Sequence, residues 1–198
     1  LANGLINSAS GNYSHAEGSG SVASGVGSHA EGWNTRAILD ASHAEGLQTI
    51  ASGACSHAEG ITTISLGLGA HTEGNSTLAL GVCSHAEGAG SISSGSYSHA
   101  EGFYNSALGV ASHAEGLRNS SSGDYSHAEG NATRSPGTYS HAEGQYSIAF
   151  GGASHAEGST TVASGAYAHS EGYATNARGD YSHAEGYTTL ASGQGSHT

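Results

Sequence analysis

The sequence predicts an all-β solenoid, in which the chain winds into stacked coils of 14 residues each. The pentapeptide Ser-His-Ala-Glu-Gly first occurs at Ser14 to Gly18 and returns, with small variations, every 14 residues to the end. Glycine recurs every seven residues, and all 14 histidines fall on the same repeat position. A period held this strictly is typical of a repeat architecture.

One half of each repeat predicts a short strand that ends at a glycine. In Ser14-His15-Ala16-Glu17-Gly18 the small residues Ser14 and Ala16 alternate with His15 and Glu17. Side chains of a β-strand point alternately to opposite faces, so the small pair shares one face and the His–Glu pair shares the other. Glycine permits a positive φ or a close backbone approach at the following turn.

The other half predicts a second strand with a different outward face. Ser21 and Ala23 precede Gly25 with the same spacing, and later repeats keep small residues at both positions. The residue between them varies freely, from Val22 to Arg36 to Ile50. Each coil therefore has two short strands with Ser, Thr and Ala inside, and each strand pairs with its equivalent in the next coil. We expect a single solenoid domain over residues 1–198 with about 14 coils, excised from a longer fibre.

A few positions depart from the repeat or carry larger residues at its turns. The glycine series breaks once, at Leu39, and Pro136 occupies another turn, so local distortion is expected at both places. Six tyrosines precede the pentapeptide at one fixed position, which predicts interrupted aromatic stacks along an edge: Tyr13, Tyr97, Tyr125, Tyr139, Tyr167 and Tyr181. Cys55 and Cys83 lie two repeats apart, roughly 9.6 Å at the usual strand spacing, which is too far for an intrachain disulfide.

Composition excludes several functions. The formal net charge is −12, with four Arg and no Lys, which does not suit nucleic acid or an anionic membrane. No apolar run approaches the length of a membrane span. Catalysis needs a single unlike constellation of residues, and every feature here recurs. We therefore expect a protein that is not an enzyme and that has no catalytic residue, cofactor or dedicated metal.

These repeats resemble the head repeats of trimeric autotransporter adhesins of the YadA type, which also have 14-residue units with Ser-x-Ala-x-Gly halves. The Ser-His-Ala-Glu-Gly spelling is also similar to repeats of bacteriophage and prophage tail-fibre proteins. The resemblance implies a left-handed parallel β-roll, a homotrimer around a threefold axis, and a role in attachment to a host or surface. It also implies an extracellular location, on a virion tail or a bacterial surface. In the adhesin heads the axis-facing strand reads Ser-Val-Ala-Ile-Gly, so His15 stands in place of Val and Glu17 in place of Ile.

We expect the His and Glu columns to form the trimer interface, because this face is uniform while the other varies as a solvated surface does. Buried charge is tolerable when it is paired, so His of one chain would pair with Glu of a neighbour and hold the trimer in register. The predicted interface consists of His15, Glu17, His29, Glu31, His43, Glu45, His57, Glu59, His71, Glu73, His85, Glu87, His99, Glu101, His113, Glu115, His127, Glu129, His141, Glu143, His155, Glu157, His169, Glu171, His183, Glu185 and His197.

Alternatives stay open at this point. The Ile, Leu and Val residues of the other strand could face the axis instead, although Arg36, Arg134 and Arg178 lie on that side. The second functional hypothesis is a ligand- or metal-binding solenoid, since imidazole suits zinc, nickel and copper. Interchain pairing would raise the His pKa values and lower those of Glu, so the trimer population would peak between these limits.

The expected partner outside the trimer is a receptor or glycan on a host surface. Exposed aromatic residues suit recognition, and four of them follow the pentapeptide glycine. These candidate receptor contacts are Trp33, Phe103, Tyr173 and Tyr187.

Overall fold

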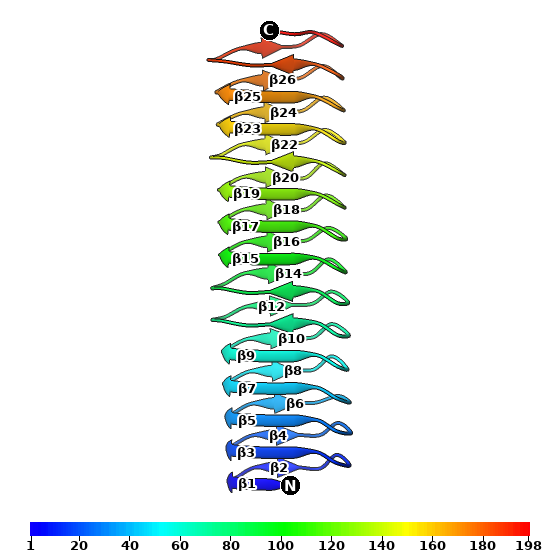
Figure 1. Ribbon diagram of the computed structural model, residues 1–198, viewed down its shortest axis with the longest axis vertical. Helices are drawn as coiled ribbons and strands as arrows, with labels where there is room; N and C mark the ends of the chain where they lie inside the picture. Colours follow the sequence, from blue (N-terminus) through cyan, green and yellow to red (C-terminus); the bar gives the residue numbers. More distant parts are fainter. The chain divides into compact units, whose positions relative to one another are not determined.

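A computed structural model describes residues 1–198, which divide into two compact units, Leu1–Ser98 and His99–Thr198. Both units contain only short strands and turns. Odd-numbered strands carry the His and Glu residues and form what we call the histidine sheet. Even-numbered strands form the variable sheet. Figure 1 shows, within each unit, every odd-numbered strand followed by an even-numbered strand that runs back in the opposite direction.

The first unit contains strands β1 to β14. Its histidine sheet consists of β1 (Ala2–Leu5), β3 (His15–Ser19), β5 (His29–Trp33), β7 (His43–Leu47), β9 (His57–Ile61), β11 (His71–Thr72) and β13 (His85–Ala86). Its variable sheet consists of β2 (Ser8–Ala9), β4 (Val22–Ala23), β6 (Arg36–Ala37), β8 (Ile50–Ala51), β10 (Ile64–Ser65), β12 (Leu78–Ala79) and β14 (Ile92–Ser93).

The second unit repeats this arrangement with strands β15 to β28. Its histidine sheet consists of β15 (His99–Phe103), β17 (His113–Leu117), β19 (His127–Asn131), β21 (His141–Ala142), β23 (His155–Ser159), β25 (His169–Tyr173) and β27 (His183–Ala184). Its variable sheet consists of β16 (Ser106–Ala107), β18 (Ser120–Ser121), β20 (Arg134–Ser135), β22 (Ile148–Ala149), β24 (Val162–Ala163), β26 (Asn176–Ala177) and β28 (Leu190–Ala191).

Pairing within both sheets is parallel and joins residues 14 positions apart. In the histidine sheet His15 lies opposite His29, and in the variable sheet Val22 lies opposite Arg36. The same register recurs in the second unit, where His113 lies opposite His127. The predicted all-β solenoid of 14-residue coils with two parallel sheets is therefore confirmed.

The interior consists of the small residues that the alternation placed inside. Ala16 and Ala23, from opposite strands of one coil, are both fully buried, and the same positions in later coils are buried too. Serine hydroxyls lie beside them, and their polarity is satisfied locally. The Ser28 hydroxyl, for example, donates a hydrogen bond of 2.8 Å to the Gly25 carbonyl. Because only small side chains separate the two sheets, the outward residues of both sheets lie close to a thin core.

Each coil has two glycine positions, one in the histidine sheet and one after the variable strand, and glycine is required at them for different reasons. Gly46, in the histidine sheet, has a φ of +106°, and a Cβ there would overlap the Gly60 carbonyl of the next coil. Gly53, after the variable strand, lacks a positive φ, yet a Cβ there would overlap the Gly67 carbonyl. Both uses predicted for glycine, positive φ and close approach, are thus present. In the second series, only close approach applies.

The coil with Leu39 keeps its register, because Arg36 and Ala37 still pair with Ile50 and Ala51. Pro136 has a local effect. It has no N–H, only one residue pair joins β20 to β22, and the Gly137 N–H donates to the Ala149 carbonyl at 3.2 Å. The distortion expected at Pro136 is therefore confined to one turn.

Left-handed residues other than glycine turn the chain at both corners of the coil. Gln48 and Tyr125 represent the two kinds of corner, with φ values of 56° and 57°. The Gln48 N–H donates to the Trp33 carbonyl at 2.8 Å, and the Tyr125 N–H donates to the Val110 carbonyl at 2.8 Å. These bonds join each corner to the corner of the preceding coil. We considered positive φ at the glycines and missed these residues in the sequence.

Cys55 and Cys83 are free, as expected from their separation, and both are exposed. No helix in the structure is long and apolar enough to cross a bilayer.

Candidate interaction face: the histidine and glutamate ladder

The histidine sheet presents one His and one Glu per coil on its outward side. Neighbouring strands align His15 with His29 and Glu17 with Glu31. These side chains partly cover one another: those of His43 and Glu45 are both 35% exposed. We call the two columns together the His–Glu ladder. Within each unit they lie as the alternation predicted; their role as a trimer interface stays a prediction.

The imidazole rings are stacked within each unit. The ring centroids of His29 and His43 are 4.8 Å apart with an interplanar angle of 3°, and His127 and His141 repeat this geometry. The stack ends at His183 and His197, where the angle opens to 61°. The 14-residue register therefore places one imidazole directly above the next.

Each imidazole lies beside a carboxylate of its own strand. The Nε2 atom of His29 is 3.4 Å from Oε2 of Glu31. In the second unit the carboxylate also reaches the next coil. Glu129 has Oε2 at 3.8 Å from His127 Nε2 and Oε1 at 3.7 Å from His141 Nε2. Pairing between His and Glu was expected across chains, and the structure shows that a single chain already contains such pairs.

Many Nε2 atoms are closed off from solvent and make no hydrogen bond. Their separations from the carboxylate oxygens, such as 3.7 Å for His113 and Glu115, are longer than a hydrogen bond. The atoms concerned are Nε2 of His29, His43, His57, His71, His113, His127, His141, His155, His169 and His183. A buried polar atom without a partner is costly, so this face is suited to receive one.

Burial lowers the pKa of four histidines. Desolvation is the largest cause for His57, His113, His127 and His155, and the positive charge of a neighbouring imidazole adds to it. Neighbouring carboxylates act in the opposite direction and do not prevail. The single chain therefore favours neutral imidazoles here. The rise in His pKa expected from interchain pairing concerns the assembled trimer.

The carboxyl groups alternate in acidity along the second unit. Hydrogen bonds with neighbouring carboxyl groups, chiefly Glu129, raise the pKa values of Glu115 and Glu143 to about 7. The same kind of bond lowers the pKa values of Glu129 and Glu157, chiefly through Glu143 and Glu171. Alternate carboxyl groups thus share protons, which reduces the repulsion between like charges in the column.

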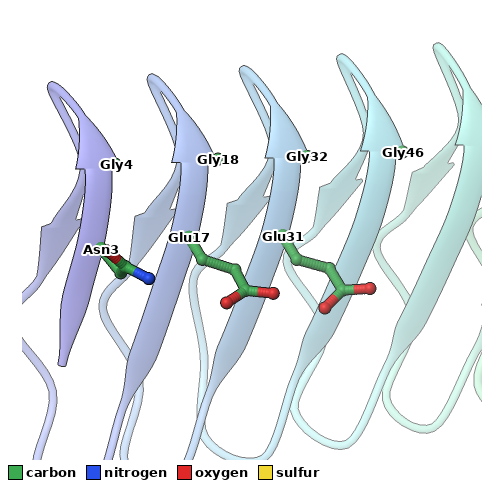
Figure 2. Close-up of a pocket in the computed structure, with 7 residues that line it drawn as sticks. All are labelled: Asn3, Gly4, Glu17, Gly18, Glu31, Gly32 and Gly46. Carbon is green, nitrogen blue, oxygen red and sulfur yellow. The ribbon is translucent and has the colours of Figure 1, made fainter.

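A shallow groove runs beside the glutamate column at the start of the chain. Asn3, Glu17 and Glu31 line it together with the backbone of Gly4, Gly18, Gly32 and Gly46. Figure 2 shows Glu17 and Glu31 projecting from the same face of adjacent strands. The groove follows the repeat and contains no constellation of unlike residues.

The variable sheet has a mixed outward face. Ile50, Ile64 and Ile148 are half-buried there, whereas Arg36 and Arg134 are exposed on the same side. Arg178 is also exposed, just after β26. This mixture matches the sequence pattern.

The candidate receptor contacts lie at the ends of histidine-sheet strands or just beyond them, and all four are exposed: Trp33 59%, Phe103 46%, Tyr173 50% and Tyr187 73%. Tyr173 and Tyr187 stack with centroids 5.2 Å apart. The aromatic stacks predicted along the tyrosine edge occur at Tyr125–Tyr139 and Tyr167–Tyr181. Contact with a receptor stays a prediction.

Comparison with known families identifies the repeat. The family model for the YadA head domain repeat matches residues 16–34, 58–84 and 142–168. Three segments of the chain therefore match the YadA head domain repeat. Repeats of this family are structural adhesin domains, exposed on bacterial cells and typically non-catalytic. A comparison with curated proteins found no match. The resemblance seen in the Ser-x-Ala-x-Gly halves is confirmed at the level of the repeat.

Proposed function

We propose that this chain is a structural, adhesive segment of a trimeric surface fibre, either a phage tail fibre or a bacterial adhesin head, that mediates attachment to a host or surface. The match to YadA head repeats supports it, since that family implies trimeric assembly. A solenoid of repeated coils provides length and rigidity and needs no unique catalytic site.

The observation that carries this proposal is the contrast between the two outward faces. The His–Glu ladder repeats the same two residues coil after coil, and many of its Nε2 atoms are desolvated without a hydrogen bond. The variable sheet mixes Ile, Arg, Ser and Asn. Contact between identical chains constrains one face uniformly, so we place the ladder at the threefold axis, where carboxylates of neighbouring chains supply further partners.

Crosslinking distinguishes the two placements of the axis. The background is a variant with Cys55→Ser and Cys83→Ser, because both native thiols are exposed. His155→Cys then places a thiol on the ladder, and Val162→Cys places one on the variable sheet of the adjoining half-coil. With a short thiol-reactive crosslinker, we expect covalent multimers from His155→Cys and none from Val162→Cys.

Light scattering on the uncrosslinked protein gives the mass in solution. We expect the mass of three chains. If Val162→Cys crosslinks, His155→Cys does not and the mass is trimeric, the variable sheet faces the threefold axis. That result would overturn the placement of the His–Glu ladder at the axis. The mass of one chain at all concentrations would overturn the trimer itself.

A further inference from the structure

We propose that the His–Glu ladder is a zinc-binding array, in which one glutamate and the two imidazoles that flank it hold a divalent transition-metal ion. The unit of the array is the triad His127, Glu129 and His141. The atoms that these residues offer as ligands lie within 4.8 Å of one another. The triad belongs to one chain, so the inference goes beyond the proposed function and does not require the trimer.

The distances within the triad suit two ligands of one ion. Glu129 directs Oε2 to within 3.8 Å of His127 Nε2 and Oε1 to within 3.7 Å of His141 Nε2. Zinc bonds to His nitrogen and carboxylate oxygen are about 2.0–2.2 Å, so two ligands at a tetrahedral angle lie about 3.3–3.6 Å apart. Small rotations of the flexible glutamate side chain close the difference.

The Nε2 atoms of His127 and His141 are available as metal ligands. Both atoms are closed off from solvent and make no hydrogen bond within the chain, so coordination would replace no bond of the chain itself. Metal binding requires a neutral imidazole with a free ring nitrogen. An imidazole–carboxylate set suits zinc, and also nickel and copper, better than it suits magnesium.

Stacking limits the number of ions. Parallel rings do not direct their lone pairs at one point, so two rings that share an ion must turn relative to each other. His183 and His197 already lie at 61°. Triads also overlap, because His141 belongs to the set around Glu129 and to the set around Glu143. Repulsion between adjacent dications favours alternate occupation, so we expect about one ion for every two coils.

Equilibrium dialysis of the full chain against Zn²⁺ alone, followed by elemental analysis, tests the array. The test variant combines Glu129→Gln, Glu143→Gln and Glu157→Gln. The matched control combines Asn131→Ala, Gln145→Ala and Ser159→Ala in the same coils, outside the ladder. We expect the wild type and the control to bind the same amount, and the test variant to lose about two ions per chain, because each ion needs a carboxylate between two imidazoles.

Two further readouts separate coordination from attraction to negative charge. Excess Mg²⁺ should leave Zn²⁺ bound, and Co²⁺ should give visible absorption bands in the wild type that weaken in the test variant. Equal zinc in both variants, or displacement by Mg²⁺, would overturn the proposal. The oligomeric mass is measured on the same samples: a wild-type chain with a trimeric mass that binds no zinc counts against the array alone, and a wild-type monomer that binds zinc counts against the trimer alone.

Discussion

At the scale of single residues, the fold depends on the absence of side chains. Successive coils approach so closely at Gly46 and Gly60 that a Cβ would overlap the carbonyl of the following coil. The buried alanines cannot be replaced by larger residues without steric overlap, because the two sheets are separated only by Ala, Ser and Thr with few exceptions. The low hydrophobicity that would suggest disorder in another chain is thus a condition of this core.

Replacing one of these glycines should destabilise the chain strongly. Gly60 has a φ of +106°, and a Cβ there would overlap the Gly74 carbonyl, so Gly60→Ala combines strain with steric overlap. We expect a loss of about 3 kcal/mol or more, and a lowering of Tm by about 2–4 °C per kcal/mol, followed by circular dichroism.

Gly27→Ala is the matched control. Gly27 has a φ of +65°, and a Cβ there would meet no heavy atom within 4 Å, so only the left-handed penalty of about 1 kcal/mol applies. Equal Tm values for the two variants would show that close approach between coils does not limit this fold.

The residue scale also shows what the sequence could not reveal. Alternation assigned the inward Ser and Ala and the outward His and Glu correctly, because side chains alternate in any strand. It did not reveal that Asp124 accepts a 2.8 Å hydrogen bond from the Val110 N–H of the preceding coil. Asp40 and Asp180 make the same bond with Val26 and Ala166. Their shared repeat position is a signal that could have predicted this role.

At the scale of the coil, buried polar ladders add to the backbone pairing. Asn105 and Asn119 are buried at a position that holds Ser or Thr in every other coil except the first, where it holds Asn7. The Asn119 N–H donates to Asn105 Oδ1 at 2.7 Å, and the Thr133 N–H donates to Asn119 Oδ1 at 2.8 Å. The Asn119 amide also donates to the Gly130 carbonyl at 2.8 Å. Asn119 therefore links three consecutive coils.

Asn119→Ala should remove the side-chain links and leave the Thr133 N–H without its acceptor in the interior. We expect a loss of about 2–4 kcal/mol, measured by chemical denaturation. Asn119→Thr is the comparison, because Thr133 occupies the same position and donates to the Glu129 carbonyl. It should recover part of the loss. If Asn119→Ala unfolds at the same denaturant concentration as the wild type, the ladder contributes nothing measurable.

At the scale of the whole molecule, the architecture was predictable and the chemistry of its ladder was only partly so. A fixed period determines which residues stack, whatever the details of the turns. The intrachain His–Glu pairs and the alternating acidity of the glutamates depend on side-chain rotamers and shared protons. Neither follows from the order of residues alone, so His–Glu pairing was assigned to neighbouring chains.

The ladder should make stability depend on pH in both directions. The pKa values of His57, His113, His127 and His155 are lowered from 6.5, so their contribution is complete above pH 6.5 and is lost as the pH falls through the folded values. The pKa values of Glu115 and Glu143 are raised from 4.5 to about 7, so their contribution is complete below pH 4.5 and is lost as the pH rises through about 7. Tm, measured with a chelator present, should therefore lose the histidine contribution as the pH falls below 6.5 and the glutamate contribution as the pH rises through about 7.

The decline on the alkaline side has a specific source that substitution can remove. Glutamine resembles a permanently protonated carboxyl group, so the double variant Glu115→Gln, Glu143→Gln should keep its Tm as the pH rises through about 7, while still losing stability in acid. Asn131→Ala with Gln145→Ala is the control in adjoining positions outside the ladder and should keep both declines. A double variant whose Tm falls across this range as steeply as that of the wild type would locate the alkaline transition elsewhere in the molecule.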